Sequence, residues 1–213
     1  MGLYKKGILG HFRGKIGTVV GAVINGIRYM RSLPDFGEDN PTEAQLNSRA
    51  KMSLIGKWLK YWKAQIRIGY QSFTNGTSPF SAAMGYHLRY AVTGVGPLYT
   101  IDYAKVKISV GELDKINSPE VAITTDGQID IAWAANGSMF SGKPTDLVTF
   151  MVYNPEKAEF VYAKGAVARS ILSYDLMVPA MFSGDTVYLW MSVVSADGKL
   201  VSESQYLGEW VIQ

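Results

Sequence analysis

The feature that most constrains the fold is the spacing of glycine near the start of the chain. Between Gly2 and Gly26 a glycine recurs every three to five residues. Each glycine inside a helix costs about 1 kcal/mol relative to alanine, so this segment does not support a stable helix. Runs of β-branched residues flank Asn25-Gly26, a pair that tolerates the positive φ of a tight hairpin turn. We therefore expect a β-hairpin with strands over 17–24 and 27–31.

A long amphipathic helix is predicted to follow. Thr42 with Gln45 three residues later is typical of a capping box, in which each side chain bonds the other residue's backbone N–H. Apolar residues recur every four positions from Leu46 to Ile66, so we expect one helix over 42–67 with an apolar face and a cationic face. The candidate interaction residues on this helix are Arg49, Lys57, Lys60, Lys63, Arg67, Trp58 and Trp62.

A second, shorter helix and a strand complete the N-terminal half. Ser78 followed by Pro79 is typical of a helix start, because proline fits the first helical position, and this predicts a helix over 80–90. A glycine- and proline-rich stretch, 94–97, is expected to end it. Apolar residues then alternate with polar ones over 98–110, which predicts a strand.

Short strands separated by turn residues fill the C-terminal half. Asp126-Gly127 and Asp197-Gly198 are two of the pairs that mark the turns. The expected strands are 121–124, 129–134, 147–153, 160–163, 168–173, 186–195 and 200–212. Seven such strands are typical of an immunoglobulin-like or fibronectin type III-like sandwich, with Trp133, Tyr188 and Trp190 as its core aromatics. The fold class predicted for the whole chain is mainly β with one long amphipathic helix.

The two halves differ in charge. Residues 1–117 hold 16 Lys and Arg against 7 Asp and Glu, whereas residues 118–213 hold 5 against 11. We therefore predict two domains, a basic one over 1–117 and an acidic sandwich over 118–213. Such asymmetry indicates that the basic half meets an anionic partner. That partner is either the acidic half of another copy, giving a homo-oligomer or larger assembly, or nucleic acid; a solvated helix face without any partner is the third alternative.

Nucleic acid is the less favoured of the two partners. The interleaved aromatic residues of the helix could stack on bases, and its cations could bind phosphates. Trp58 and Trp62 are however four residues apart on the apolar stripe, where packing against a core is the more ordinary role.

Several kinds of chemistry lack the residues they need. The chain has no cysteine, which excludes disulfides and thiolate sites. His11 and His87 are its two histidines, and neither lies in a catalytic or metal-binding motif. The glycine pattern around Gly14-Lys15 does not fit a phosphate loop, because no Ser or Thr follows Lys15 and no helix is expected after it. We accordingly expect a non-enzymatic protein with no cofactor, no metal and no catalytic residue.

The N-terminal region contains no membrane segment by its hydropathy. The apolar run from Thr18 to Ile24 is far shorter than the roughly 20 residues that a spanning helix needs. The lysines at positions 5 and 6 are not followed by the apolar stretch of a signal peptide. A cytoplasmic or particle-associated location is therefore favoured.

Three stretches carry a resemblance to a known family. They are Gly7 to Gly21 with its Gly-Lys-Ile-Gly pattern, Arg28 to Pro34, and Thr42-Glu-Ala-Gln45 with Arg49. Over about the first 90 residues the chain resembles a family of roughly 200-residue proteins of unknown function that is common in Bacteroidota. The resemblance implies a bacterial or bacteriophage setting and no mechanism; the exit Pro41-Thr42-Glu-Ala-Gln45 is similar to a Pro-x-Thr-x-x-Gln exit of phage-like virion proteins.

The expected function is that of a structural, self-assembling subunit of a filament, virion or cell-surface assembly. In this hypothesis the glycine-rich hairpin packs closely on other strands, the amphipathic helix covers it, and unlike basic and acidic surfaces join the copies. The alternative is a binding module that recognises a glycan or nucleic acid.

Overall fold

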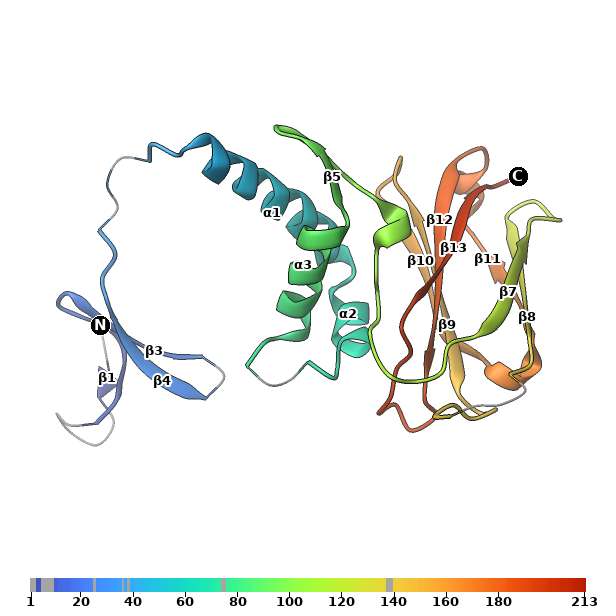
Figure 1. The fold of residues 1–213 in the computed structure, drawn as a ribbon, viewed down its shortest axis with the longest axis horizontal. Helices are drawn as coiled ribbons and strands as arrows, with labels where there is room; N and C mark the ends of the chain where they lie inside the picture. The colour runs from blue at the N-terminus through green and yellow to red at the C-terminus, as the bar shows by residue number, and fades with distance from the viewer. Residues whose placement is uncertain are drawn as a thin grey trace. The chain divides into compact units, whose positions relative to one another are not determined.

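The computed structural model describes residues 3–4, 10–24, 26–35, 37, 39–73, 76–136 and 140–213 (Figure 1). Over these residues the protein is mainly β, with four sheets and three α-helices. The chain forms two compact units, residues 1–45 and residues 46–213. The helices thus belong to the same unit as the C-terminal strands. That residues 1–117 and 118–213 are two separate domains stays a prediction.

The N-terminal unit is an antiparallel sheet whose strands follow one another in chain order. Its strands are β1 (Leu3–Tyr4), β2 (Phe12–Ile16), β3 (Val19–Ile24) and β4 (Ile27–Ser32). Ile24 pairs with Ile27, so the expected hairpin is confirmed, and Gly26 in its turn has a φ of +80°. Asn25 lies outside the described residues. At Gly21 a Cβ atom would collide with the backbone of Phe12, so glycine permits the close strand packing that its spacing predicted.

This sheet has almost no core of its own. Among its described side-chain positions Gly21 alone is buried, and every residue of β4 is exposed. Ile27 and Met30 are 69% and 70% exposed. A sheet of this kind needs a covered apolar face to be stable, so these apolar side chains call for a partner surface.

The predicted long helix is wrong in one respect, because the chain forms two helices there. α1 (Glu43–Tyr61) begins at the expected capping box, where the Thr42 and Gln45 side chains bond each other's backbone N–H groups at 3.4 and 2.9 Å. Trp62 leaves the helical conformation, with φ −94° and ψ 5°, and α2 (Lys63–Gly69) follows.

The spacing of the apolar residues explains the break. Residues four apart are rotated by about 40° around a helix of 3.6 residues per turn, so a strict four-residue stripe drifts to the far side within five steps. Leu46, at the start of the stripe, is accordingly 51% exposed, while Ile55, Trp58 and Leu59 are buried. A change of direction at Trp62 allows Ile66 in α2 to be buried as well.

The third helix is close to its prediction, and the strand after it is not. α3 (Pro79–Tyr90) starts with the Ser78 side chain accepting a hydrogen bond from the Ser81 N–H at 3.1 Å. A hairpin follows, β5 (Val92–Val95) and β6 (Leu98–Ile101), whose turn is the glycine- and proline-rich stretch. The strand predicted over 98–110 stops at Ile101, because the Asp102 side chain caps a 3₁₀ turn at residues 103–105.

The described residues after β6 form seven strands, as many as the sequence predicted. They are β7 (Asn117–Ala122), β8 (Gln128–Ala134), β9 (Leu147–Asn154), β10 (Glu159–Ala168), β11 (Ser173–Met177), β12 (Thr186–Val194) and β13 (Gln205–Val211). They form a four-stranded sheet in the order β10-β9-β12-β13 and a three-stranded sheet in the order β11-β8-β7. The expected fifth strand is displaced, since a 3₁₀ turn occupies residues 169–171.

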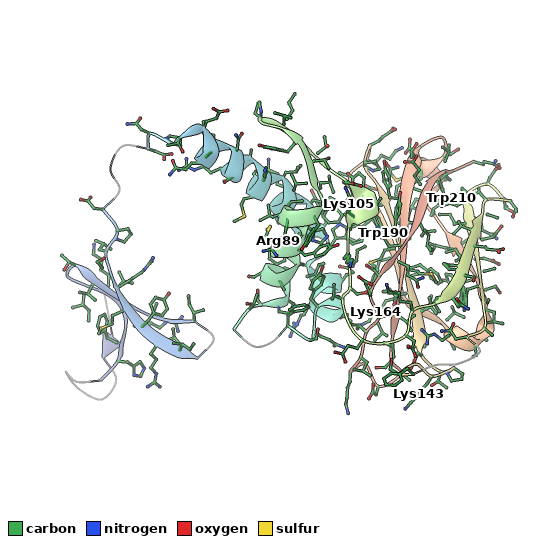
Figure 2. The ribbon with its side chains drawn as sticks, viewed as in Figure 1. Arg89, Lys105, Lys143, Lys164, Trp190 and Trp210 are labelled. Atoms are coloured by element: carbon green, nitrogen blue, oxygen red, sulfur yellow. The ribbon has the colours of Figure 1, made fainter. Side chains whose placement is uncertain are left out.

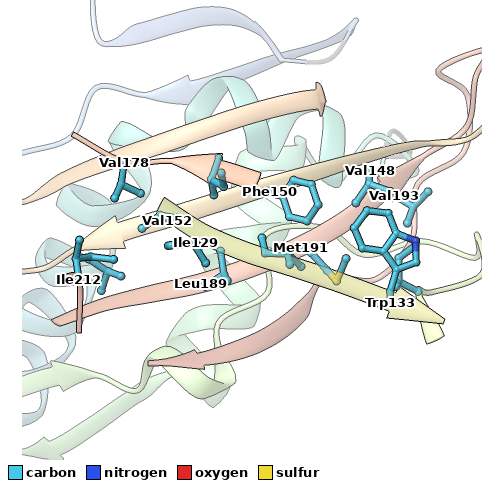
Figure 3. Close-up of a cluster of buried hydrophobic side chains, with 14 of the residues drawn as sticks. Ile129, Trp133, Val148, Phe150, Val152, Val178, Leu189, Met191, Val193 and Ile212 are labelled. Carbon is cyan, nitrogen blue, oxygen red and sulfur yellow. The ribbon is translucent and has the colours of Figure 1, made fainter. Parts of the chain in front are cut away.

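One apolar core lies between these two sheets (Figure 3). Phe150, Leu189 and Met191 of the four-stranded sheet meet Ile129 and Trp133 of the three-stranded sheet there. Trp133 is buried as predicted, and its indole N–H donates to the Arg169 carbonyl at 2.9 Å.

A second core covers the other face of the four-stranded sheet. Trp58 and Trp62 from the helices pack with Tyr153 and Trp190 from the strands, and Figure 2 shows Trp190 on this side of its sheet. Trp190 and Tyr188 are therefore core aromatics as expected, but of the helix-facing core instead of the one between the sheets. The buried side chains of the helices pack on this sheet. That the helix covers the glycine-rich hairpin stays a prediction.

A glycine at the end of α2 tests how closely this helix packs on the segment after β6 that contains Ile108 and Ser109. A Cβ at Gly69 would collide with the Ile108 carbonyl and lie 2.8 Å from Ser109 Cα, so we expect Gly69→Ala to lower the free energy of unfolding by about 1–3 kcal/mol. Gly85→Ala in α3 is the matched control, because a Cβ there meets nothing, and it should leave stability unchanged or raise it by up to about 1 kcal/mol. Urea denaturation measures both, and equal effects would contradict this packing.

Candidate functional site: two sheet faces of opposite charge

One face of the N-terminal sheet gathers exposed cations. Lys15 pairs with Val20, which pairs with Arg31, so these residues form one row across β2, β3 and β4. Side chains alternate along a strand, so Arg13 lies on the same face as Lys15. We call this the basic face; its residues are Arg13, Lys15 and Arg31 with Val20, Ala22, Ile24, Ile27 and Tyr29.

The basic face combines charge with exposed apolar and aromatic surface. Its three cations are exposed, and Ile24 and Tyr29 are 58% and 36% exposed. Residues 1–34, which include all four strands, contain no Asp or Glu; the nearest acids along the chain, Asp35, Glu38 and Asp39, come after β4. Such a surface suits an anionic partner that also presents apolar contacts.

The outer face of the three-stranded sheet has the opposite character. Ala122 of β7, Asp130 of β8 and Asp175 of β11 form one row across it, and Glu120 pairs with Ala132 in the next row. We call this the acidic face; its residues are Glu120, Ala122, Asp130, Ala132, Ser173 and Asp175. Residues 116–142 and 170–198, which hold all three strands, contain no Lys or Arg.

Carboxylates on this face are charged and close together. The Thr124 hydroxyl and the Gln128 amide donate hydrogen bonds to Asp130 and hold the pKa of its carboxyl below the usual range. Asp175 lies directly opposite on the neighbouring strand, and like charges in such a pair destabilise a sheet. A cation docked here would relieve that repulsion.

The candidate residues predicted on the helix fall into two groups. Arg49, Lys57 and Lys60 of α1 and Lys63 and Arg67 of α2 are exposed, as the cationic face required. Trp58 and Trp62 are 5% and 0% exposed, so they do not offer ring faces to a ligand.

The two tryptophans instead hold the helices on the sheet. Trp62 stacks on Phe160 with ring centroids 4.8 Å apart, and Trp58 meets Tyr153 edge-on at 6.1 Å. Aromatic pairs in these arrangements add about 0.5–1.5 kcal/mol beyond the area they bury.

Sequence reasoning did not single out either sheet face as a site. Its signals were nonetheless present: cations at Arg13 and Lys15 two positions apart in a strand, and a cation-free stretch around Glu120 and Asp130. Counting charge by strand and by alternate positions, instead of by half of the chain, would have found both.

His87 is buried and fully hydrogen-bonded. Nδ1 lies 2.7 Å from the Ala83 carbonyl, and the Lys107 N–H donates to Nε2 at 3.3 Å. An amide N–H can only donate, so Nε2 is the unprotonated nitrogen and the ring is neutral. Burial lowers the pKa of His87 to about 4, against the smaller opposing effect of its bond to Ala83.

A buried arginine organises the loop before β9. Asp114 accepts hydrogen bonds from the backbone N–H groups of Phe140, Ser141 and Gly142 at 2.7 to 2.9 Å, which lower the pKa of its carboxyl. Arg169 is 3% exposed and donates to the Asp114 carbonyl. These bonds account for the arginine as a structural residue.

The part of the chain that the structure describes gathers no group of three or more His, Asp or Glu side chains able to hold a metal ion. Within the same residues, no helix has the length and apolarity needed to cross a membrane.

Comparison with protein families gives a match over most of the chain. A model described as a family of unknown function (DUF6266) matches residues 11–208. The chain belongs to this family. The DUF6266 match includes the residues of both charged faces and extends well beyond the first 90 residues that carried the resemblance. A search of the curated proteins finds no match. The bacterial or bacteriophage setting stays a prediction.

Substitutions on the helices separate packing from charge in this DUF6266 chain. Trp62→Ala should lower the free energy of unfolding by about 3–5 kcal/mol, because it empties a fully buried site. Lys57→Ala, on the exposed side of α1, should change it by no more than about 0.5 kcal/mol. Thermal and urea unfolding measure both; a stable Trp62→Ala variant would show that the helices do not depend on this contact.

The pH dependence of stability tests the state of His87. Its pKa is about 4 in the folded protein and 6.5 in the unfolded chain, so its contribution is complete above pH 6.5 and is lost as pH falls through 4. We expect up to about 3 kcal/mol of such loss. His87→Gln removes the titration, so urea unfolding at several pH values should show a shallower decline for the variant. Parallel profiles would contradict the neutral buried ring.

Proposed function

We propose that this protein is a structural, self-assembling subunit of a filament, virion or cell-surface assembly, in which unlike basic and acidic surfaces join the copies. The observation that carries the proposal is the N-terminal sheet, whose strand β4 is exposed throughout although Ile27, Tyr29 and Met30 are large and apolar. Monomeric proteins rarely leave such a surface uncovered.

The C-terminal strands support a display or docking role. We infer that they form an immunoglobulin-like sandwich of the fibronectin type III kind. In its favour, the third and fourth strands, β9 and β10, lie in one sheet with β12 and β13, while β7, β8 and β11 form the other. Sandwiches of this architecture recur in cell-surface proteins.

A binding module for nucleic acid or a glycan is the second candidate. Exposed Tyr29 beside Arg31 on the basic face favours its nucleic-acid form, because a ring and a cation together bind single strands. The buried Trp58 and Trp62 do not contribute to it. Fluorescence anisotropy with a labelled single-stranded oligonucleotide tests this candidate: binding that weakens steeply as salt rises would support its nucleic-acid form, and no binding would exclude that form.

Light scattering of the purified protein tests self-assembly. We expect association at about 0.01 M salt and a fall of the average mass toward the 23.4 kDa monomer at about 1 M, where the Debye length has dropped from roughly 30 to 3 Å. The reason is that opposite charges attract the copies and salt screens them. A monomer at every salt and protein concentration would exclude this function.

A further inference from the structure

The two charged faces differ in shape as well as in charge. The basic face projects large side chains, including Ile27 at 69% exposure and Tyr29. The acidic face is hollow, with a depression of about 230 Å³ between its carboxylates. Ala122, Ala132 and Ser173 are small and leave this space open.

The charges on the two faces are equal in number and opposite in sign. Arg13, Lys15 and Arg31 stand on the basic face, and Glu120, Asp130 and Asp175 stand on the acidic face. No residue of opposite sign belongs to either set. Complementary potentials of this kind speed encounter, exclude wrong partners and attract the copies in a way that salt screens.

Like-with-like docking is a poorer solution for the N-terminal sheet. If the basic faces of two copies met, Arg13, Lys15 and Arg31 of each copy would meet the same three cations of the other. Like charges brought together in this way oppose association. The cations of this face therefore favour an acidic partner over an identical face.

We propose that the basic face of one copy docks onto the acidic face of a second copy, with Tyr29 or Ile27 filling the depression beside Ala132. This inference rests on the proposed function and names the surfaces that perform it. Because the two surfaces are unlike, a pair of copies joined by one contact still has one free basic face and one free acidic face. Such a contact builds a closed ring, of which a reciprocal pair is the smallest, or an open filament.

Charge reversal in the full-length protein tests the docking. Lys15→Glu/Arg31→Glu makes both faces of a chain acidic, and Glu120→Lys/Asp175→Lys makes both basic. Each variant alone should associate at least about tenfold more weakly than the unchanged protein. An equimolar mixture should regain association, because every basic face then meets an acidic one. Sedimentation velocity measures this, and circular dichroism confirms that the variants fold.

Two further variants sharpen the test. Lys57→Glu/Lys60→Glu reverses the same number of exposed charges on α1 and should leave association unchanged. Ala132→Tyr fills the depression without changing charge and should weaken association at least about tenfold.

The outcomes separate this inference from the function on which it rests. Association that is lost in the α1 variant and kept in both sheet variants would overturn the docking and keep self-assembly. If the sheet variants lost association and the equimolar mixture did not recover it, the docking would also be overturned. A monomeric protein whose basic face binds the acidic face of the same chain would overturn it as well. An unchanged protein that never associates would overturn both.

Discussion

The sheet β10-β9-β12-β13 is covered on both faces, and the rest of the larger unit depends on this. Along β12, Leu189 and Met191 point into the core between the sheets, while Trp190 points into the core under the helices. A strand that is apolar on both faces cannot leave either in water without losing roughly 25 cal/mol for each Å² exposed. The three-stranded sheet covers one face, and the helices must cover the other. The same requirement fixes where Trp58 and Trp62 lie, and it removes them from the surface.

Much of this architecture could be predicted from the sequence, but the pairing of its layers could not. The hairpin at Gly26, the capping box at Thr42 and the count of seven C-terminal strands each depend on local chemistry, and each was found. A strict four-residue stripe hid the helix break at Trp62, because rotation accumulates slowly along a helix. The runs 148–153 and 187–194, with few polar residues, indicate strands buried on both faces, and this signal would have assigned the helices to their sheet.

The candidate site was harder to predict, because charge acts through faces. The net charges of the two halves of the chain predicted a basic surface and an acidic surface. The cations chosen as candidate interaction residues were nevertheless those of the helix. Strand register was needed to bring Lys15 and Arg31 into one row, and Asp130 and Asp175 into another. Register depends on turn lengths and long-range pairing, which a count of charges does not contain. The sequence therefore predicts the signs of the two surfaces and leaves their positions open.

Because the N-terminal sheet has almost no core, its free energy of unfolding depends on what covers it. A four-stranded meander whose one buried residue, within the described positions, is Gly21 gains little from burying apolar area by itself. Covering Ile27 and Tyr29 of the basic face against another surface would supply what is missing, and the free energy gained would count as both association and folding. Gly21 serves the same end. Because it has no side chain, it lets β3 lie against Phe12 and leaves the sheet thin enough to dock as a layer. Stability of the N-terminal unit should thus rise with protein concentration, whereas that of residues 46–213, with two cores of their own, should not.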